Sequence, residues 1–332
     1  MTSKRYALRH KIRRHMKIRK KSLFAIILAA VLAVAVVTSR IMRNMPHRQA
    51  AGNQKIIVVT TLFPLYDMAK HIGADRADVS MLLPPGMEPH SFEPKPGDIL
   101  KINEADIFVY TGKFMEPWAD TIIQSVTNKN LVVVDAGQGT VTTAESYGCE
   151  GPAGATDPHI WLDFDNAKTM TDNILSAFDA KDPEHAEFYG KNAAAYKAGL
   201  TELDSEFRAA LASCRSREIV YGGHYAFGYM ARRYNLEYVA AQGLSPDAEP
   251  TAKDMAKLVE QIRKNDIKYI FYEELTSPRV AYTIAGETGA KMLPLNPAEN
   301  LTRDRFRSGA TLFDILREDL ANLKTGLGCK IK

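Results

Sequence analysis

Three histidines lie in sequence frames that suit metal binding. They are His90 in PPGMEPHSFEPKPGDI, His159 in ATDPHIWLDFDNA and His224 in YGGHYAFGYMARRYNL. Histidine is the commonest metal ligand among side chains, and neutral imidazoles from separate segments can converge on one cation. A lone histidine is more often a structural residue, but three of them in strand-end loops favour a shared site. Capture of a metal ion is therefore the first hypothesis.

A fourth ligand is expected near the C-terminal end of the chain, in the segment LPLNPAENLT. Glu299 is its best oxygen donor, and Asn296 is the alternative. Glu88, two residues before His90, could coordinate instead, although a charge at the rim of the site is the simpler interpretation. Asp157 and Asp163, on either side of His159, are expected to lie in a turn whose carboxylates brace imidazole nitrogens from outside the ligand shell.

The other histidines and two methionines lack this context. His71 and His185 lie on helical patterns, and we assign them to the solvated surface. Met87 and Met115 are interpreted as core or rim residues, with a thioether ligand for copper as the alternative. Four aromatic residues near the proposed site are expected to pack around it: Phe92, Trp118, Phe227 and Tyr229.

The residues after position 54 alternate between strand-like and helix-like patterns. Apolar runs separated by amphipathic segments predict parallel sheets covered by helices on both faces, so the predicted fold class is α/β. In such sheets ligands bind at the carboxyl ends of the strands, which is where the candidate ligands lie. A first lobe is predicted over residues 55–180. Its strands are expected in KIIVVTT, DVSMLLPP, ADIFVYTG and NLVVVDAG, and its helices in LFPLYDMAKHIG, GDILKINE and EPWADTIIQSV.

One long helix is predicted from Asp182 to Ser213. Apolar residues recur there at spacings of mostly three and four, without an internal proline. Asp182 can cap the helix, and Pro183 suits its first turn. At 1.5 Å per residue the helix would span roughly 45 Å. We therefore expect residues 181–213 to form a rigid connector between two lobes.

A second α/β lobe is predicted over residues 214–332. Its strands are expected in REIVYGG, LEYVAAQ, IKYIFYEE and AKMLPLN, and its helices in AKDMAKLVEQIRKN, SPRVAYTIAGETG and residues 303–327. A chain of this length suffices for two lobes with separate cores. Residues 137–156 carry small and polar side chains without a period, which predicts a loop long enough to act as a lid or flap.

The N-terminal segment, residues 1–54, indicates an exported protein. Ten Lys or Arg residues precede the unbroken apolar run 23–37. Cations of this kind stay on the cytoplasmic side while the apolar stretch enters the bilayer. The folded body should then lie outside the cytoplasm, at the cell surface or in the periplasm. Two outcomes stay open: cleavage after small residues within the run, or an uncleaved membrane anchor over residues 22–38.

The charge distribution argues against nucleic acid as a partner. Residues 1–54 hold 13 of the 43 Lys and Arg residues and no Asp or Glu, which leaves 30 basic and 39 acidic residues in the rest of the chain. Binding to phosphate needs a basic face on the folded domain, and the body has an excess of acid instead.

The three cysteines are Cys149, Cys214 and Cys329. Export places them in an oxidising compartment, where at most two of three can pair within the chain. Because Cys214 and Cys329 bracket the second lobe, we predict a disulfide bond between them, with Cys149 in a loop. Three unpaired thiols are the alternative.

Over residues 55–330 the chain resembles the metal-binding solute-binding proteins of zinc and manganese ABC importers, the cluster 9 or ZnuA/TroA-like family. The resemblance is carried by HSFEPKPGDI, DPHIWLDFDNA, HYAFGY and EELTSPRVAYTIAGETGAK followed by LNPAENLT, all in the family's order. It implies two (β/α) lobes with parallel sheets, joined by one long rigid backbone helix, and a metal between them. It also implies one ligand from each of His90, His159, His224 and the LNPAENLT loop, which makes Glu299 the fourth.

The donor set favours zinc as the transported ion. Three imidazoles and one carboxylate suit tetrahedral Zn²⁺, whereas the family's manganese receptors typically replace one histidine by a carboxylate. Manganese or iron is the alternative. The ligands must be neutral, so binding should weaken as pH falls through about 6 to 7. The family's common zinc receptors carry a histidine-rich loop that residues 137–156 do not match, so no metal-scavenging role is expected there.

The resemblance implies delivery of the metal to an ABC permease by a monomeric receptor that is not an enzyme. A zinc hydrolase would need an open coordination position and a general base, and the sequence contains no HExxH or paired-carboxylate motif. A metal-dependent adhesin that keeps the fold is a further alternative, and as a mere scaffold it predicts no stabilisation by zinc. The rigid helix predicts that metal binding rearranges mainly loops.

Overall fold

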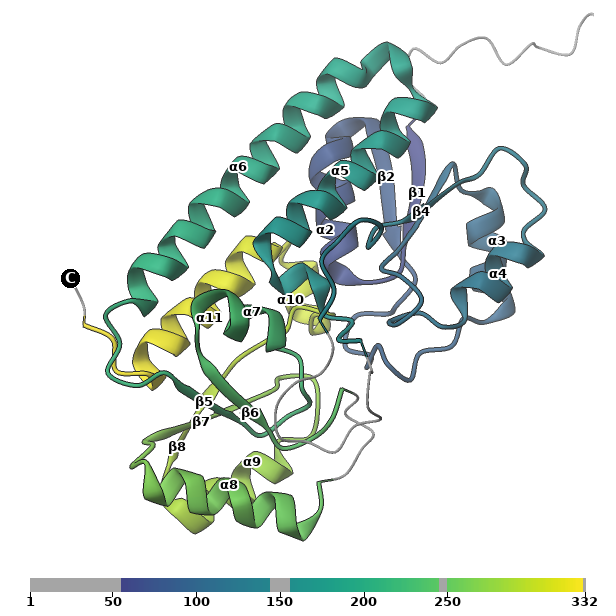
Figure 1. Cartoon of the computed structure of the whole chain (residues 1–332). Helices are drawn as coiled ribbons and strands as arrows, with labels where there is room; N and C mark the ends of the chain where they lie inside the picture. Colours follow the sequence, from purple (N-terminus) through teal and green to yellow (C-terminus); the bar gives the residue numbers. More distant parts are fainter. Residues whose placement is uncertain (1–54, 144–155, 245–249, 331–332) are drawn as a thin grey trace, which may run out of the picture. The chain divides into compact units, whose positions relative to one another are not determined.

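Two four-stranded parallel sheets organise the residues that the structure describes (Figure 1). The structure is a computed structural model that describes residues 55–143, 156–244 and 250–330. These residues belong to one unit, Lys55–Lys332. Among them, no helix combines the length and the apolar character needed to cross a membrane. The predicted leader, with its anchor candidate at residues 22–38, lies outside the described residues.

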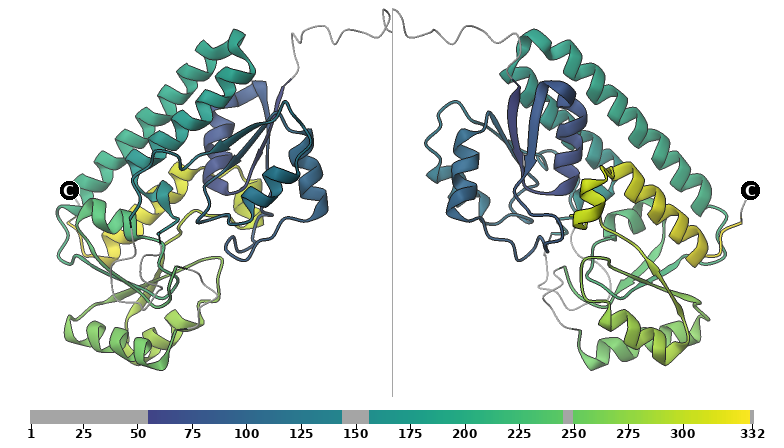
Figure 2. Two further views of the ribbon diagram at one scale, coloured as in Figure 1. Left: turned by 45° about the vertical axis from the view of Figure 1, so that its right-hand side comes forward. Right: turned by 180° about the vertical axis from the view of Figure 1, so that it is seen from behind.

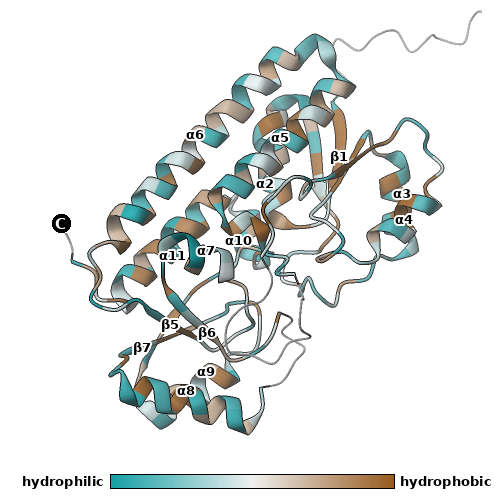
Figure 3. Ribbon diagram, in the orientation of Figure 1, coloured by the Kyte–Doolittle hydropathy of each residue, from teal (hydrophilic) through white to brown (hydrophobic). Residues whose placement is uncertain are grey.

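The first sheet has the strand order β2-β1-β3-β4, and every neighbouring pair is parallel. Its strands are rich in β-branched and aromatic residues, which suit a pleated surface buried on both faces. Figure 3 shows β1 in the brown of apolar residues. The strands are β1 (Ile56–Thr60), β2 (Ala77–Met81), β3 (Ile107–Tyr110) and β4 (Val132–Asp135). The helices are α2 (Phe63–Gly73), α3 (Pro96–Glu104), α4 (Ala119–Ser125) and α5 (Phe164–Lys181), with 3₁₀ turns η1 (Ala74–Arg76) and η2 (Ile160–Leu162).

The second sheet repeats this arrangement as β6-β5-β7-β8, again with parallel neighbours. Its strands are β5 (Glu218–Tyr221), β6 (Glu237–Ala240), β7 (Tyr269–Tyr272) and β8 (Lys291–Pro294). The helices are α7 (Gly228–Tyr234), α8 (Ala252–Lys264), α9 (Arg279–Thr288), α10 (Arg303–Arg307) and α11 (Leu312–Gly326). The predicted fold class, α/β with two parallel-sheet lobes, is confirmed.

The long helix α6 (Ala186–Leu211) connects the lobes. It packs against α2 and α5 of the first lobe and against α11 of the second lobe. Figure 2 shows the yellow helix α11 beside α6. The prediction that Asp182 caps this helix was wrong, because the 3₁₀ turn η3 (Pro183–His185) comes first and His185 is the N-cap residue. The Asp182 carboxylate instead accepts hydrogen bonds from His185 Nδ1 and Tyr189 Oη.

Three helical features differ from the prediction. Helices α5 and α7 were not predicted. Asp163 is the N-cap residue of α5, and its carboxylate accepts hydrogen bonds from the amides of the first turn. The single helix predicted over residues 303–327 is two helices. Gly309, at φ +76°, follows α10, and Thr311 starts α11 through a capping box with Asp314.

One hydrophobic core extends through both lobes. It includes Val58 and Phe63 from the first lobe, Leu200 from α6, and Phe271 and Leu316 from the second. The expectation of separate cores was therefore wrong for the main core, because α6 presents one apolar stripe to helices of both lobes. Two smaller clusters lie apart from it, one in each lobe.

The predicted disulfide bond is confirmed. Cys214 is bonded to Cys329 across 115 positions of sequence. Cys214 follows α6 and Cys329 follows α11, so the bond ties together the ends of two helices that pack against each other. Cys149 lies outside the described residues.

Candidate metal centre

Each of the four predicted ligands lies in a segment that follows a strand. His90 lies in the loop between β2 and α3, and His159 at the start of η2, after β4. His224 lies in the turn after β5, and Glu299 in the segment after β8. Parallel strands present their carboxyl ends at one edge of a sheet, so each sheet contributes two of these side chains to one place.

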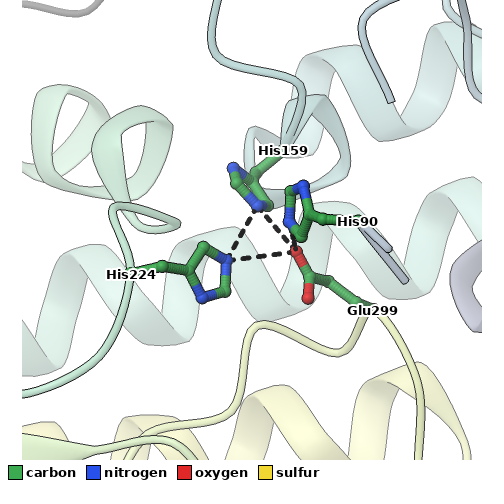
Figure 4. Close-up of side chains that lie close together, drawn as sticks. All are labelled: His90, His159, His224 and Glu299. Carbon is green, nitrogen blue, oxygen red and sulfur yellow. Dashed lines mark hydrogen bonds and ion pairs between the residues drawn. The ribbon is translucent and has the colours of Figure 1, made fainter. Parts of the chain in front are cut away.

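The structure brings the four side chains together (Figure 4). One ligand atom from each lies within 4.8 Å of the other three. Glu299 Oε1 is 2.6 Å from His159 Nε2, 3.1 Å from His90 Nε2 and 3.3 Å from His224 Nε2. Four donors held about 2 Å from a tetrahedral zinc ion lie about 3.3 Å from one another. These three separations lie at or below that value, so the arrangement fits such an ion after small outward shifts.

Carboxylates orient the two most buried imidazoles. Asp157 Oδ1 accepts a hydrogen bond from His159 Nδ1 at 2.7 Å, and Glu273 Oε2 accepts one from His224 Nδ1 at 2.7 Å. A proton held at Nδ1 leaves the Nε2 lone pair for a cation. The role of Asp157 agrees with the prediction, whereas the same role predicted for Asp163 was wrong, because its carboxylate caps α5 and pairs with Arg233. The role of Glu273 was missed, although its place directly after β7 is the same strand-end position that marks the ligands.

Burial differs among the four side chains. The imidazoles of His159 and His224 are fully buried, and the side chain of Glu299 is 3% exposed. His90 is 10% exposed and is therefore the ligand nearest to solvent. The centre is thus largely buried, with His90 at its rim.

The charges around the four side chains favour a positive charge at the centre. Burial by itself lowers the pKa of His159, but Asp157 and Glu299 outweigh it and raise that pKa. Burial opposes the protonation of His224 as well, and there Glu273 and Glu299 hold the pKa well above its ordinary value. For Glu299, burial acts to raise the pKa, whereas the neighbouring imidazoles bring it well below its ordinary value. The carboxylates together create a site that attracts a cation.

Side chains close to His159 and His224 in the sequence donate hydrogen bonds to the segment that carries Glu299. Trp161 Nε1 donates a hydrogen bond to the carbonyl of Pro297 at 2.8 Å. Tyr221 Oη donates to the carbonyl of Leu295 at 3.0 Å. Trp161 lies two residues after one buried histidine and Tyr221 three before the other. Buried hydrogen bonds therefore link the fourth ligand's segment to both.

The alternative fourth ligands have other partners. Asn296 Oδ1 accepts a hydrogen bond from the amide of Ala298, and its Nδ2 donates to Glu274. The Glu88 carboxylate accepts hydrogen bonds from the backbone amides of His90 and the next residue, and so closes the turn on which His90 lies. Both side chains shape the loops of the centre and lie outside the four-residue group.

The remaining candidates lie elsewhere. His71 is exposed, as expected, whereas His185 is half-buried against Asp182. Met115 is in the core and Met87 is exposed. Across residues 55–143, 156–244 and 250–330, these four side chains, His90, His159, His224 and Glu299, form the one group of His, Cys, Asp or Glu residues that could hold a metal ion.

The predicted lid is only partly described. Residues 144–155 lie outside the described residues, so the lid stays a prediction. The two ends of this loop lie together, because the amide of Asp157 donates to the carbonyl of Thr143 at 3.0 Å. Tyr229 Oη accepts from the amide of Thr143 and donates to the carbonyl of Asp157, which anchors both ends on α7.

Arg233 on α7 connects three elements close to the centre. Its Nε and Nη2 each lie 2.8 Å from a carboxylate oxygen of Asp204 on α6. Its Nη1 donates to Asp163 at 3.1 Å and to Asp165 at 2.9 Å, at the start of α5. Burial acts to raise the pKa of Asp204, but the hydrogen bonds from Arg233 and Tyr234 lower it to about 2. This ion-pair network joins the second lobe to the first, four residues after His159.

Comparison with known proteins gives consistent matches. Residues 58–326 match the family model described as zinc-uptake complex component A, periplasmic (ZnuA). The zinc-binding protein AdcA of Streptococcus pyogenes is 38% identical over 295 residues, which cover 83% of this chain and 57% of the relative. This chain therefore spans little more than half of that relative's length.

Two further matches cover nearly all of the compared protein. The high-affinity zinc uptake system protein ZnuA of Bacillus subtilis is 37% identical over 281 residues, which cover 82% of this chain and 88% of the relative. The crystal structure of the Zn(II)-bound ZnuA-like domain of Streptococcus pneumoniae AdcA superposes with a TM-score of 0.71 at 35% identity, over 82% of this chain and 99% of that domain. From the extent of the family match and the identity to these relatives, the chain belongs to the ZnuA family of zinc-uptake components, as its motifs predicted.

Proposed function

We propose that this chain is an extracytoplasmic receptor that binds zinc with high affinity and delivers it to an ABC importer. The observation that carries the proposal is the convergence of three imidazole Nε2 atoms and one carboxylate oxygen within 4.8 Å. Three nitrogen donors and one oxygen donor suit tetrahedral zinc, and the relatives named above are zinc-binding and zinc-uptake proteins. A manganese or iron receptor of the same family is the alternative.

The proposed ligands are His90, His159, His224 and Glu299. Together they would fill a tetrahedral coordination sphere with protein atoms and leave no position for a substrate or an activated water. A closed, buried centre supports binding and transport of the ion rather than hydrolysis. The ion is then the cargo of this protein.

The proposed partners and location follow from the family and the leader. A zinc-uptake component implies an ABC permease that receives the ion, with the receptor acting outside the cytoplasm. We assign residues 1–54 to a signal peptide or membrane anchor, 55–180 and 214–332 to the two lobes, and 181–213 to the connecting helix.

Metal titration with matched histidine variants tests the ligand set. Metal-free wild type, His224→Ala and His71→Ala would each compete for Zn²⁺ with a chelator of known affinity. Removing one of four ligands should lower the affinity of His224→Ala at least a hundredfold. His71→Ala, an exposed histidine outside the group, should match the wild type. Equal affinities for wild type and His224→Ala would refute the proposal.

The identity of the ion needs a second measurement. Protein loaded in a mixture of equal Zn²⁺ and Mn²⁺, then desalted, should retain zinc as measured by elemental analysis. Zinc binds more tightly than manganese at most nitrogen-containing sites, so the decisive comparison is the rate of metal uptake by cells in which this protein is the sole receptor. Preferential uptake of manganese would favour the alternative.

A further inference from the structure

Asn300 is a fully buried residue next to the proposed ligand Glu299. Its Nδ2 donates two hydrogen bonds, to the carbonyls of Pro84 and Met87, each at 2.8 Å. Both acceptors lie more than 200 positions away in the sequence, in the loop that carries His90. A buried side-chain amide that donates both of its hydrogen bonds to one distant loop fixes the position of that loop.

A backbone hydrogen bond also joins the loop of His90 to the segment of Glu299. The backbone amide of Gly86, which has φ +85°, donates to the carbonyl of Leu301 at 2.7 Å. The amide of Met87 donates to the carbonyl of Pro84 and closes the turn between them. Asn300 therefore holds both ends of one tight turn, and Gly86 holds its middle.

His90 depends on that turn for its position. The loop between β2 and α3 comprises 14 residues without a helix or strand, and it is held at its start where the amides of Leu82 and Leu83 donate to the carbonyls of Thr60 and Thr61. After the turn, the Glu88 carboxylate accepts hydrogen bonds from the amides of His90 and Ser91. Asn300 thus holds the turn, and Glu88, which follows the turn, holds the backbone of His90. His90 is the most exposed of the four proposed ligands.

Glu299 does not depend on the Asn300 side chain in the same way. Its carbonyl accepts a hydrogen bond from the amide of Phe63 at 3.1 Å. The preceding residues of its segment are held through Trp161 and Tyr221. Loss of the Asn300 amide would therefore release the loop of His90 while the backbone of Glu299 stays in place.

We propose that Asn300 is a positioning residue that docks the loop of His90 onto the segment of Glu299 and thereby keeps His90 within bonding distance of the metal. This inference rests on the proposed function. On this proposal the centre opens to solvent most easily at His90. The ion would then enter and leave past His90.

A double-mutant cycle between Asn300 and His90 tests the inference. Zinc affinities are measured by chelator competition for wild type, Asn300→Ala, His90→Ala and the double variant. Residues that orient metal ligands typically contribute ten- to a hundredfold to affinity, so Asn300→Ala should weaken binding by about that factor. In the His90→Ala background the same substitution should change affinity less than about twofold, because the loop then carries no ligand.

Asn322→Ala is the matched control. Its Nδ2 donates to the carbonyl of Pro294 at 3.0 Å on the exposed side of α11, far from the loop of His90 in sequence. This control should bind zinc like the wild type. Hydrogen exchange of the metal-free proteins adds a local readout: residues 84–91 should exchange faster in Asn300→Ala and unchanged in Asn322→Ala.

Each outcome decides between the two proposals. Equal zinc affinity for wild type and His90→Ala would refute the ligand set itself. Weak binding by His90→Ala together with unchanged binding by Asn300→Ala would refute only the role of Asn300. An equal loss from Asn300→Ala in both backgrounds would also refute it, since the effect would not act through His90. If Asn300→Ala does not fold, Asn300→Asp keeps the size and the acceptor for the Leu301 amide, removes the two donors, and is expected to show the same coupling.

Discussion

Arg233→Met is the substitution that most directly tests how the two lobes are held together. The guanidinium is 8% exposed and pairs with Asp204 on α6 and with Asp163 and Asp165 at the start of α5. Methionine fills similar volume but removes every hydrogen bond and leaves the buried carboxylate of Asp204 without its main partner. We expect metal-free Arg233→Met to be less stable than the wild type.

The magnitude follows from the pKa of Asp204. Burial raises this pKa, but Arg233 and Tyr234 bring it to about 2, against an ordinary value of 3.8. At 1.36 kcal/mol per pKa unit, this difference corresponds to about 2 kcal/mol of stability. Arg233 is the group that lowers this pKa most, whereas Tyr234 and Arg208 remain in the variant, so the loss at neutral pH should be up to about 2 kcal/mol.

The sign of the pH dependence is fixed by the same shift. The folded-state pKa of Asp204 lies below the unfolded one, so the stabilisation is fully present above about pH 4 and is lost as pH falls through about 2. Urea unfolding of metal-free wild type and Arg233→Met should therefore differ most near pH 7, and the difference should shrink below about pH 4 and vanish only as pH falls to about 2. Arg208→Met is the control, because Arg208 also pairs with Asp204 but is 55% exposed and should contribute less than about 1 kcal/mol. A wild-type advantage that is independent of pH would refute the reasoning.

Two further predictions concern the disulfide bond and the orientation of an imidazole. Replacing both Cys214 and Cys329 by serine opens a loop closed across 115 positions, and the loop-entropy relation gives a loss of about 5 kcal/mol in urea unfolding, with zinc affinity unchanged because the effect lies in the unfolded state. Glu273→Gln keeps an acceptor beside the imidazole Nδ1 but removes the charge, so zinc affinity in chelator competition should fall about tenfold to a hundredfold. An affinity within twofold of the wild type would show that Glu273 does not support the ligand.

Much of the fold was predictable because apolar strands alternate with amphipathic helices along the whole body. The bounds of the elements were less predictable where a polar side chain had several possible hydrogen-bond partners nearby. Asp182 was predicted to cap the long helix, but its carboxylate bonds His185 and Tyr189 instead, and the helix begins at Ala186. Helix α7 was missed because seven residues are too short for a helical period to stand out.

The candidate site was predictable in its histidines because each follows a strand end, and parallel sheets gather such positions at one edge. Glu299 and Asn296 were harder to separate, since both belong to one loop. The distinction comes from Asn296 being occupied by Ala298 and Glu274, which a sequence does not reveal. Glu273 was missed for a related reason: its partner lies 49 positions away and is known only once β5 and β7 pair.

The continuous core described above has a consequence for how the molecule denatures. Proteins built from two independently packed halves can lose one half while the other stays folded. Here residues on one face of α6, such as Tyr196 and Phe207, belong to the same apolar cluster as Val58 in one sheet and Phe271 in the other. Melting either half would strip contacts from the shared helix and weaken the remaining half. The body should therefore melt in a single cooperative transition, with equal van't Hoff and calorimetric enthalpies.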